Sequence, residues 1–212
     1  MGRIYDATWG RAFAALYDRG LRATEEGGLH ELRRQVLGEA TGRTVDLGAG
    51  TGVNAELFPP AVTEVVMVEP DPHMMRQLRD KPAARRGDIT LVEASAEHLP
   101  FDDDSFDTAV FTLVLCTVPD PDKALAEAAR VLKPGGRLLF IEHVRSQQPE
   151  LARWQDRLER PWRFLGDGCH CNRDTAATIE SSPFETESLE DGQLPKAPPI
   201  VRPLVSGSAR LP

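Results

Sequence analysis

The stretch TVDLGAGTG, residues 44–52, decides the predicted fold. Its first four residues form a short apolar run, which favours a buried parallel strand. The run ends in the glycine-rich turn GAGTG, residues 48–52, and a short helix is predicted to begin at Val53. Glycine permits a positive φ and lets a ligand lie against the backbone, and N–H groups at a helix start attract an anion. The stretch therefore predicts a ligand-binding loop at the end of a strand.

A second apolar run, EVVMVE at residues 64–69, ends in a carboxylate seventeen residues after Gly52. In nucleotide-binding α/β sheets, an acid at this position accepts hydrogen bonds from the ribose hydroxyls. A glycine loop alone is also typical of a plain tight turn, but the loop, the spacing and Glu69 together predict a nucleotide-like ligand. Val53 stands where the dinucleotide fingerprint has its third glycine, which disfavours a diphosphate cofactor.

VDLGAGTG followed by VEP resembles the first two motifs of class I S-adenosylmethionine-dependent methyltransferases. The resemblance implies a Rossmann-like α/β fold, with a seven-stranded, mostly parallel sheet, an antiparallel last strand and helices on both faces. It implies that the loop lies under the methionyl group and that Glu69 binds the ribose. LKPGG at residues 132–136 is a further signature of this family.

The segment SAEHLPF, residues 95–101, resembles the adenine-contact loop of the same family. Ser95 replaces the usual aspartate, so the backbone of Ala96 is expected to make the hydrogen bond to the adenine. The cofactor-binding residues implied for S-adenosylmethionine are Asp46, Gly48, Ala49, Gly50, Gly52, Asn54, Glu69, Pro70, Met74, Ser95, Ala96, Glu97, Thr112 and Leu113.

Length and composition fit one globular unit: 212 residues, 41% hydrophobic and 27% charged. We expect an N-terminal helical lid over residues 1–40 and a cofactor-binding domain over residues 41–212. A net charge of −8 argues against nucleic acid as the main partner. No apolar run approaches the ~20 residues of a membrane span, so we expect no membrane anchor and a cytoplasmic location. The oligomeric state is left open.

Hydrophobic periodicity predicts two helices in residues 1–40, with a break at Gly27 and Gly28. The first carries an unusual density of aromatic residues, which favours a lid over plain core packing. Further helices are predicted at residues 72–78, 120–132, 151–165 and 175–180. Further strands are predicted at residues 89–93, 106–111 with an extension to 116, 137–142, 184–189 and 201–209, with the last two paired antiparallel.

Cys116 and His143 follow the ends of two predicted strands, where ligands bind in open α/β sheets. Cys169 and Cys171 flank His170, but structural zinc sites separate paired cysteines by two to four residues, so no metal site is predicted. A nucleophilic cysteine is also unsupported, because methyl transfer needs no covalent enzyme intermediate.

Three longer segments are similar to the methyltransferase-like seven family, whose members are thiol S-methyltransferases. They are TLVLCTV at residues 112–118, EHV at 142–144, and W…P-W-x-x-x-G-D-G-C…R-D-T from Trp154 to Thr175. The likeness covers nearly the whole chain after residue 40. The animal proteins begin with a hydrophobic membrane anchor, which this sequence does not show.

This second resemblance places His143, Asp167, Cys169 and Arg173 in the substrate region. We expect His143, Arg173 and Asp167 to be the catalytic group, with His143 taking the proton of a small acceptor thiol and Arg173 favouring the anion. We expect a set of apolar, aromatic and thiol side chains to exclude water and to contact the acceptor: Tyr5, Phe13, Tyr17, Cys116, Trp154, Trp162 and Cys169.

The sequence is also compatible with other functions. The same fold methylates oxygen, nitrogen or carbon of metabolites, quinones or lipids. A cofactor-binding protein without catalysis is an alternative of another class, and a nicotinamide-dependent dehydrogenase is a more distant one.

Overall fold

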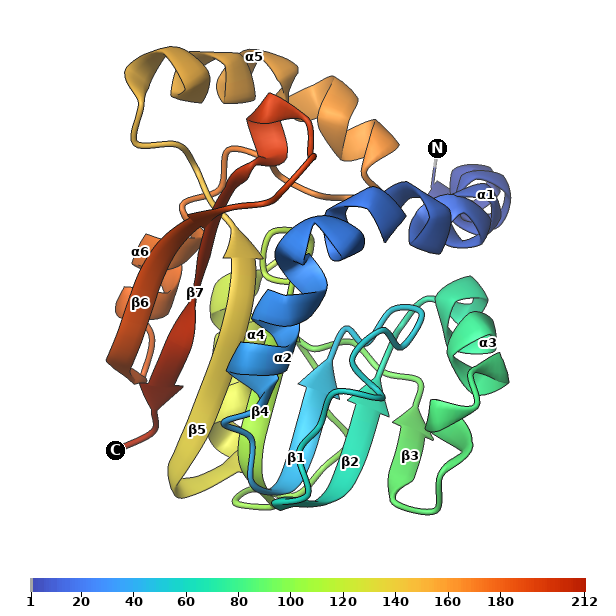
Figure 1. Ribbon diagram of the computed structural model, residues 1–212, viewed down its shortest axis with the longest axis vertical. Coiled ribbons are helices and arrows are strands. Elements are labelled where there is room, and N and C mark those ends of the chain that lie inside the picture. The colour runs from blue at the N-terminus through green and yellow to red at the C-terminus, as the bar shows by residue number, and fades with distance from the viewer. Residues whose placement is uncertain (1) are drawn as a thin grey trace.

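Figure 1 shows the computed structural model, which describes the backbone of residues 2–212 and the side chains from Gly10 onward. Seven strands form one sheet in the order β3-β2-β1-β4-β5-β7-β6. Neighbours from β3 to β5 are parallel, and β7 is antiparallel to both β5 and β6. The strands are β1 (Gly42–Leu47), β2 (Val62–Val68), β3 (Ile89–Val92), β4 (Phe106–Thr112), β5 (Leu132–His143), β6 (Glu185–Gln193) and β7 (Pro203–Arg210). The predicted Rossmann-like fold with an antiparallel last strand is confirmed.

Helices cover both faces of the sheet: α2 (His30–Leu37) lies on one face and α4 (Pro121–Val131) on the other (Figure 1). Successive residues of a strand point to opposite faces. In β4, Phe111 packs in the core that contains α4, whereas Val110 packs in the core that contains α2. The central strands are therefore apolar on both sides, which explains their continuous hydrophobic runs.

The remaining helices lie mostly near the carboxyl ends of the strands (Figure 1). Helix α3 (Pro72–Asp80) is capped by Asp71, which accepts hydrogen bonds from the N–H groups of His73 and Met74. The other elements are α1 (Gly2–Thr24), α5 (Pro149–Leu165), α6 (Thr175–Glu180) and the short η1 (Glu25–Leu29), η2 (Ala83–Arg85) and η3 (Pro199–Val201). Among the described residues, no helix has the length and hydropathy needed to cross a bilayer.

The N-terminal segment is helical with the predicted break. Gly28 has a φ of 135°, which separates α1 from α2. This conformation is open to glycine and strained for other residues. The kink lets α2 pack on the sheet while α1 extends beyond it (Figure 1).

Two local predictions are wrong. No helix begins at Val53: residues 50–57 form consecutive turns, with hydrogen bonds from Ala55 N to Gly52 O and from Leu57 N to Asn54 O. The side chain of Asn54 is held in the interior, which fixes the segment in this path. The fourth strand does not extend to residue 116 but ends at Thr112, because Leu113 has a φ of 63° and turns the chain away.

Candidate active site

A cavity of about 660 Å³ lies at the carboxyl ends of the parallel strands. Its wall combines the glycine loop after β1, the ends of β2, β4 and β5, the last half of α1 and the end of α5. Its volume is in the range of small-molecule sites, and its position is where open α/β sheets bind their ligands.

Glu69 joins the two cofactor motifs. Its carboxylate accepts hydrogen bonds of 2.8 Å from the N–H of Gly50 and 2.8 Å from the N–H of Asp71. Burial raises the pKa of Glu69 to about 7, although both backbone hydrogen bonds oppose this shift. The loop and the predicted ribose acid therefore meet at one wall of the cavity.

A buried polar network supports the loop from below. The Asn54 amide donates to Asp46 and to the hydroxyl of Thr112 (3.1 and 3.0 Å), and its oxygen accepts from Arg33 at 3.0 Å. Asp46 is fully buried, and this burial raises its pKa to about 7. Because these groups satisfy one another beneath the loop, they fix its path.

The predicted cofactor residues divide into two groups. Lining the cavity are Gly48, Gly50, Glu69, Pro70, Met74, Ser95, Ala96 and Leu113. Outside the cavity wall are Asp46, Ala49, Gly52, Asn54, Glu97 and Thr112. The Glu97 carboxylate accepts hydrogen bonds from the Ser95 hydroxyl at 2.9 Å and from the Asp120 N–H at 2.7 Å. Glu97 therefore holds the predicted adenine loop in place without lining the cavity.

Helix α1 covers one side of the cavity with Phe13 and Tyr17, whose ring centroids are 5.5 Å apart. Burial raises the pKa of Tyr17 to about 12, so its phenol remains protonated. The predicted acceptor contact of Tyr5 lies outside the described side chains. Asp18 accepts hydrogen bonds from the Thr51 hydroxyl at 2.5 Å and from Lys81 at 3.0 Å, and thereby fastens α1 to the body of the protein.

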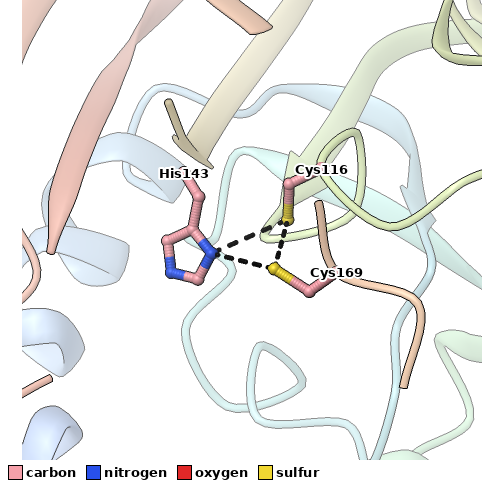
Figure 2. A group of neighbouring side chains, drawn as sticks. All are labelled: Cys116, His143 and Cys169. Atoms are coloured by element: carbon pink, nitrogen blue, oxygen red, sulfur yellow. Dashed lines mark hydrogen bonds between the residues drawn. The ribbon is translucent and has the colours of Figure 1, made fainter. Parts of the chain in front are cut away.

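Three side chains from distant segments meet in the same wall: Cys116 after β4, His143 at the end of β5, and Cys169 after α5 (Figure 2). The two sulfur atoms are 3.8 Å apart. His143 Nδ1 lies 3.8 Å from Cys116 Sγ and 3.5 Å from Cys169 Sγ. We call these three residues the thiol–imidazole cluster. All three are buried, and the cysteines are free thiols.

The cluster shifts the pKa values of its own members. The hydrogen bond with Cys169, together with burial, raises the pKa of Cys116. Burial lowers the pKa of His143, but the hydrogen bond to Cys116 and the charges of Cys116 and Glu142 outweigh it, so the net shift is upward. Among the described residues, His143 Nε2 has no hydrogen-bond partner although it is buried.

Two groups behind the cluster hold the turn that carries Cys116. The carboxylate of Glu142 accepts hydrogen bonds from the N–H groups of residues 114, 115 and 116, at 2.8, 2.9 and 3.2 Å. Arg173 donates to the carbonyls of Leu115 and Val118 at 2.5 and 2.7 Å. Arg173 does not line the cavity, so its predicted contact with the acceptor is not seen in this structure.

Of the two tryptophans predicted to contact the acceptor, only Trp162 lines the cavity. The placement of Trp154 there is wrong: its side chain is 52% exposed on α5, with Arg157 over its ring. Only the C-terminal end of α5 lines the cavity, and Trp154 lies about two turns before that end along the helix. Asp167 lines the cavity as expected.

Sequence reasoning missed three polar residues of the site: Glu142, Arg33 and Asp18. Glu142 had a usable signal, since a carboxylate at the end of a buried apolar strand requires partners. Arg33 interrupts the apolar stripe of α2, where its side chain is 1% exposed. Asp18 gives no comparable signal, because its role depends on where α1 packs.

Residues 45–140 match the methyltransferase domain family. The chain is 41% identical to thiol S-methyltransferase TMT1B of Rattus norvegicus over 150 residues, which cover 69% of this chain and 61% of that protein. It is 35% identical to TMT1B of Homo sapiens over 187 residues, which cover 84% of this chain and 76% of that protein. The chain thus spans less than two thirds of the rat protein's length.

One further relative and one solved structure are also similar to this chain. The ubiquinone/menaquinone biosynthesis C-methyltransferase UbiE of Vibrio parahaemolyticus is 37% identical over 192 residues, covering 84% of this chain and 73% of that protein. The crystal structure of a S-adenosylmethionine-dependent methyltransferase from Thermotoga maritima superposes with a TM-score of 0.69 at 23% identity, covering 95% of this chain and 98% of that one. The latter likeness concerns the fold alone.

Proposed function

This chain belongs to the class I S-adenosylmethionine-dependent methyltransferases, close to the TMT1 thiol S-methyltransferases, and we propose that its own acceptor is a small thiol. S-adenosylmethionine is its cofactor. The observation that carries the proposal is the thiol–imidazole cluster, which lies in the wall of the cofactor cavity beside apolar side chains.

In this proposal the cofactor occupies the half of the cavity formed by the glycine loop and Glu69. Gly48 and Gly50 lie under the methionyl group, Glu69 accepts hydrogen bonds from the ribose, and Ser95 and Ala96 border the adenine. The acceptor occupies the other half, against Trp162 and the cluster. Helix α1, with Phe13 and Tyr17, acts as the lid that excludes water from both.

The reaction needs the acceptor as a thiolate, because the thiolate is the nucleophile and a free thiol with a pKa of about 8.5 is mostly protonated at pH 7. The thiol loses its proton at the cluster, where His143 is the base predicted from the sequence. The sulfur then forms a bond to the methyl carbon, and the electrons of the breaking bond pass to the sulfonium sulfur, giving a methyl thioether and S-adenosylhomocysteine. Alignment of the two reactants supplies much of the rate enhancement.

Arg173 and Asp167 have different roles in this proposal. Arg173 is a positioning residue in this proposal, since it holds the turn that carries Cys116. Asp167 lines the cavity and contributes negative charge near Glu69, which favours a cationic cofactor. The free cysteines are typical of a reducing compartment, and a cytoplasmic location is part of the proposal.

The similarity to UbiE supports a second candidate, carbon methylation of a quinone precursor. Transfer of labelled methyl from S-adenosylmethionine should be measured with alkyl and aryl thiols, matched alcohols and amines, and a hydroxylated quinone precursor. Transfer to thiols alone, rising between about pH 6 and pH 9 as the thiol ionises, is the expected result. Transfer to the quinone precursor alone would reject the thiol proposal.

A further inference from the structure

The thiol–imidazole cluster has the geometry of a metal site. Zinc bonds cysteine sulfur at about 2.3 Å and histidine nitrogen at about 2.0–2.1 Å in a tetrahedron. Those bond lengths place two ligand sulfurs about 3.8 Å apart and a sulfur and a nitrogen about 3.5–3.6 Å apart. The cluster has 3.8 Å between sulfurs, and 3.5 and 3.8 Å between sulfur and nitrogen (Figure 2).

We propose that Cys116, His143 and Cys169 bind one zinc ion, with the fourth coordination position open to the cavity. Two thiolates and a neutral imidazole are a donor set that selects zinc over harder cations. All three residues line one cavity, so a cation among them faces it on its remaining side. Three protein ligands with one open position are typical of catalytic rather than structural zinc.

Charge and burial support the same assignment. Two buried thiolates without a cation would be strongly disfavoured, whereas a divalent ion neutralises both. The cluster is also held rigidly from behind: Glu142 fixes the turn of Cys116, and Cys169 N donates to Gly166 O. The expectation of no metal site rested on the spacing of Cys169 and Cys171. The structure instead brings Cys169, which follows α5, next to Cys116 after β4 and His143 at the end of β5.

The open position deepens the proposed thiol methylation, on which this step rests. A thiol that coordinates zinc loses its proton outright. The acceptor binds as a thiolate, and its proton leaves to solvent. Its sulfur then attacks the methyl carbon while the bond between that carbon and the sulfonium sulfur breaks. The neutral thioether product is a poorer ligand and leaves. Coordination through Nδ1 puts the proton of His143 on Nε2, so His143 acts as a ligand rather than as the predicted base. The cation instead lowers the pKa of the bound thiol, whose proton passes to solvent.

Metal content tests the site without reference to activity. The full chain should be purified under reducing conditions without chelators, and its metal measured by mass spectrometry. We expect about one equivalent of zinc per chain in the wild type, and its loss in Cys169→Ser and His143→Gln. Cys171→Ser is the matched control: this buried thiol bonds Gln155 O and lies outside the cluster, so zinc should be retained. Cofactor-induced thermal stabilisation will show which variants fold.

Cobalt substitution of the wild type keeps the test decisive if a variant does not fold. Cobalt should give the intense visible bands of a tetrahedral site with thiolate charge transfer, and a small alkyl thiol, but not the matched alcohol, should shift them.

Three results would overturn the site: no metal in the wild type, a Cys116–Cys169 disulfide in its place, or zinc retained in both cluster variants. Zinc bound without methyl transfer to any thiol would reject the proposed function and leave the site standing. Undiminished thiol methylation by the metal-free enzyme would overturn the role of the ion.

Discussion

The carboxylate of Glu69 accepts a hydrogen bond of 2.8 Å from the backbone N–H of Gly50, although these residues follow different strands. β1 and β2 are parallel neighbours, so their carboxyl ends meet at one edge of the sheet. The acid is therefore held in place before any ligand arrives. A pre-positioned acceptor loses little conformational freedom on binding.

Removal of the Glu69 carboxylate should weaken cofactor binding. Hydrogen bonds to charged groups contribute about 1.5–3 kcal/mol each, so Glu69→Ala should raise the Kd of S-adenosylhomocysteine by about 10- to 100-fold. Calorimetric titration measures this directly. Glu93→Ala is the control, because that exposed residue directly follows the neighbouring strand β3 and pairs with Arg79. An equal loss in both variants would contradict the assignment.

Cofactor affinity should depend on pH near neutrality. Burial raises the pKa of Glu69 to about 7 in the free protein, and the ribose hydroxyls bind its ionised form. Binding therefore lowers this pKa and releases a proton, so affinity should fall by up to about tenfold per pH unit below pH 7 and level off above it. Titrations between about pH 6 and pH 8 check this. Glu69→Gln should remove most of the slope; an unchanged slope would assign it to another group.

The Asp18 contacts with Thr51 and Lys81 should control opening of α1. Asp18→Ala removes an acceptor of two hydrogen bonds and should raise hydrogen exchange in the second half of α1 by about tenfold. It should also raise the KM of the acceptor. Glu26→Ala removes an exposed carboxylate from the adjoining segment and serves as the comparison. Identical exchange in the two variants would show that these contacts do not close the lid.

The two tryptophans of α5 should behave differently. Trp162 lines the cavity, so Trp162→Ala should reduce kcat/KM for bulky apolar thiols by about tenfold or more through lost apolar contact. Trp154 is largely exposed, so Trp154→Ala should leave kinetics and stability nearly unchanged. A selectivity profile measured across thiols of increasing size separates the two. Equal effects would mean that the acceptor lies elsewhere.

Loss of Glu142 should destabilise the protein, since its carboxylate satisfies three backbone N–H groups in a buried turn. Unsatisfied buried donors cost about 1–3 kcal/mol each, and partial relaxation limits the expected loss for Glu142→Ala to about 2–4 kcal/mol. Denaturant unfolding measures it. Glu190→Ala, at an exposed position on β6, should change stability by less than about 0.5 kcal/mol.

The cofactor half of the site could be predicted because its signals are local. The apolar run before Gly48 is buried on both faces of a parallel sheet, and the glycine turn has to follow it within a few residues. Glu69 and Cys116 then follow strands whose carboxyl ends meet at one edge, whatever the rest of the chain does. The prediction of a helix at Val53 is wrong because the Asn54 side chain donates a hydrogen bond to the buried Asp46. Hydrophobic periodicity does not reveal such a contact.

The sequence by itself determined the sheet, the glycine loop and Glu69, because these depend on hydrophobic patterning and short-range backbone geometry. Only the tertiary structure decided that Cys116, His143 and Cys169 meet, that Trp162 rather than Trp154 lines the cavity, and that Asp18 fastens α1. These contacts join residues far apart in the chain. Their distances are set by how helices and loops pack on the sheet, which spacing along the sequence does not encode.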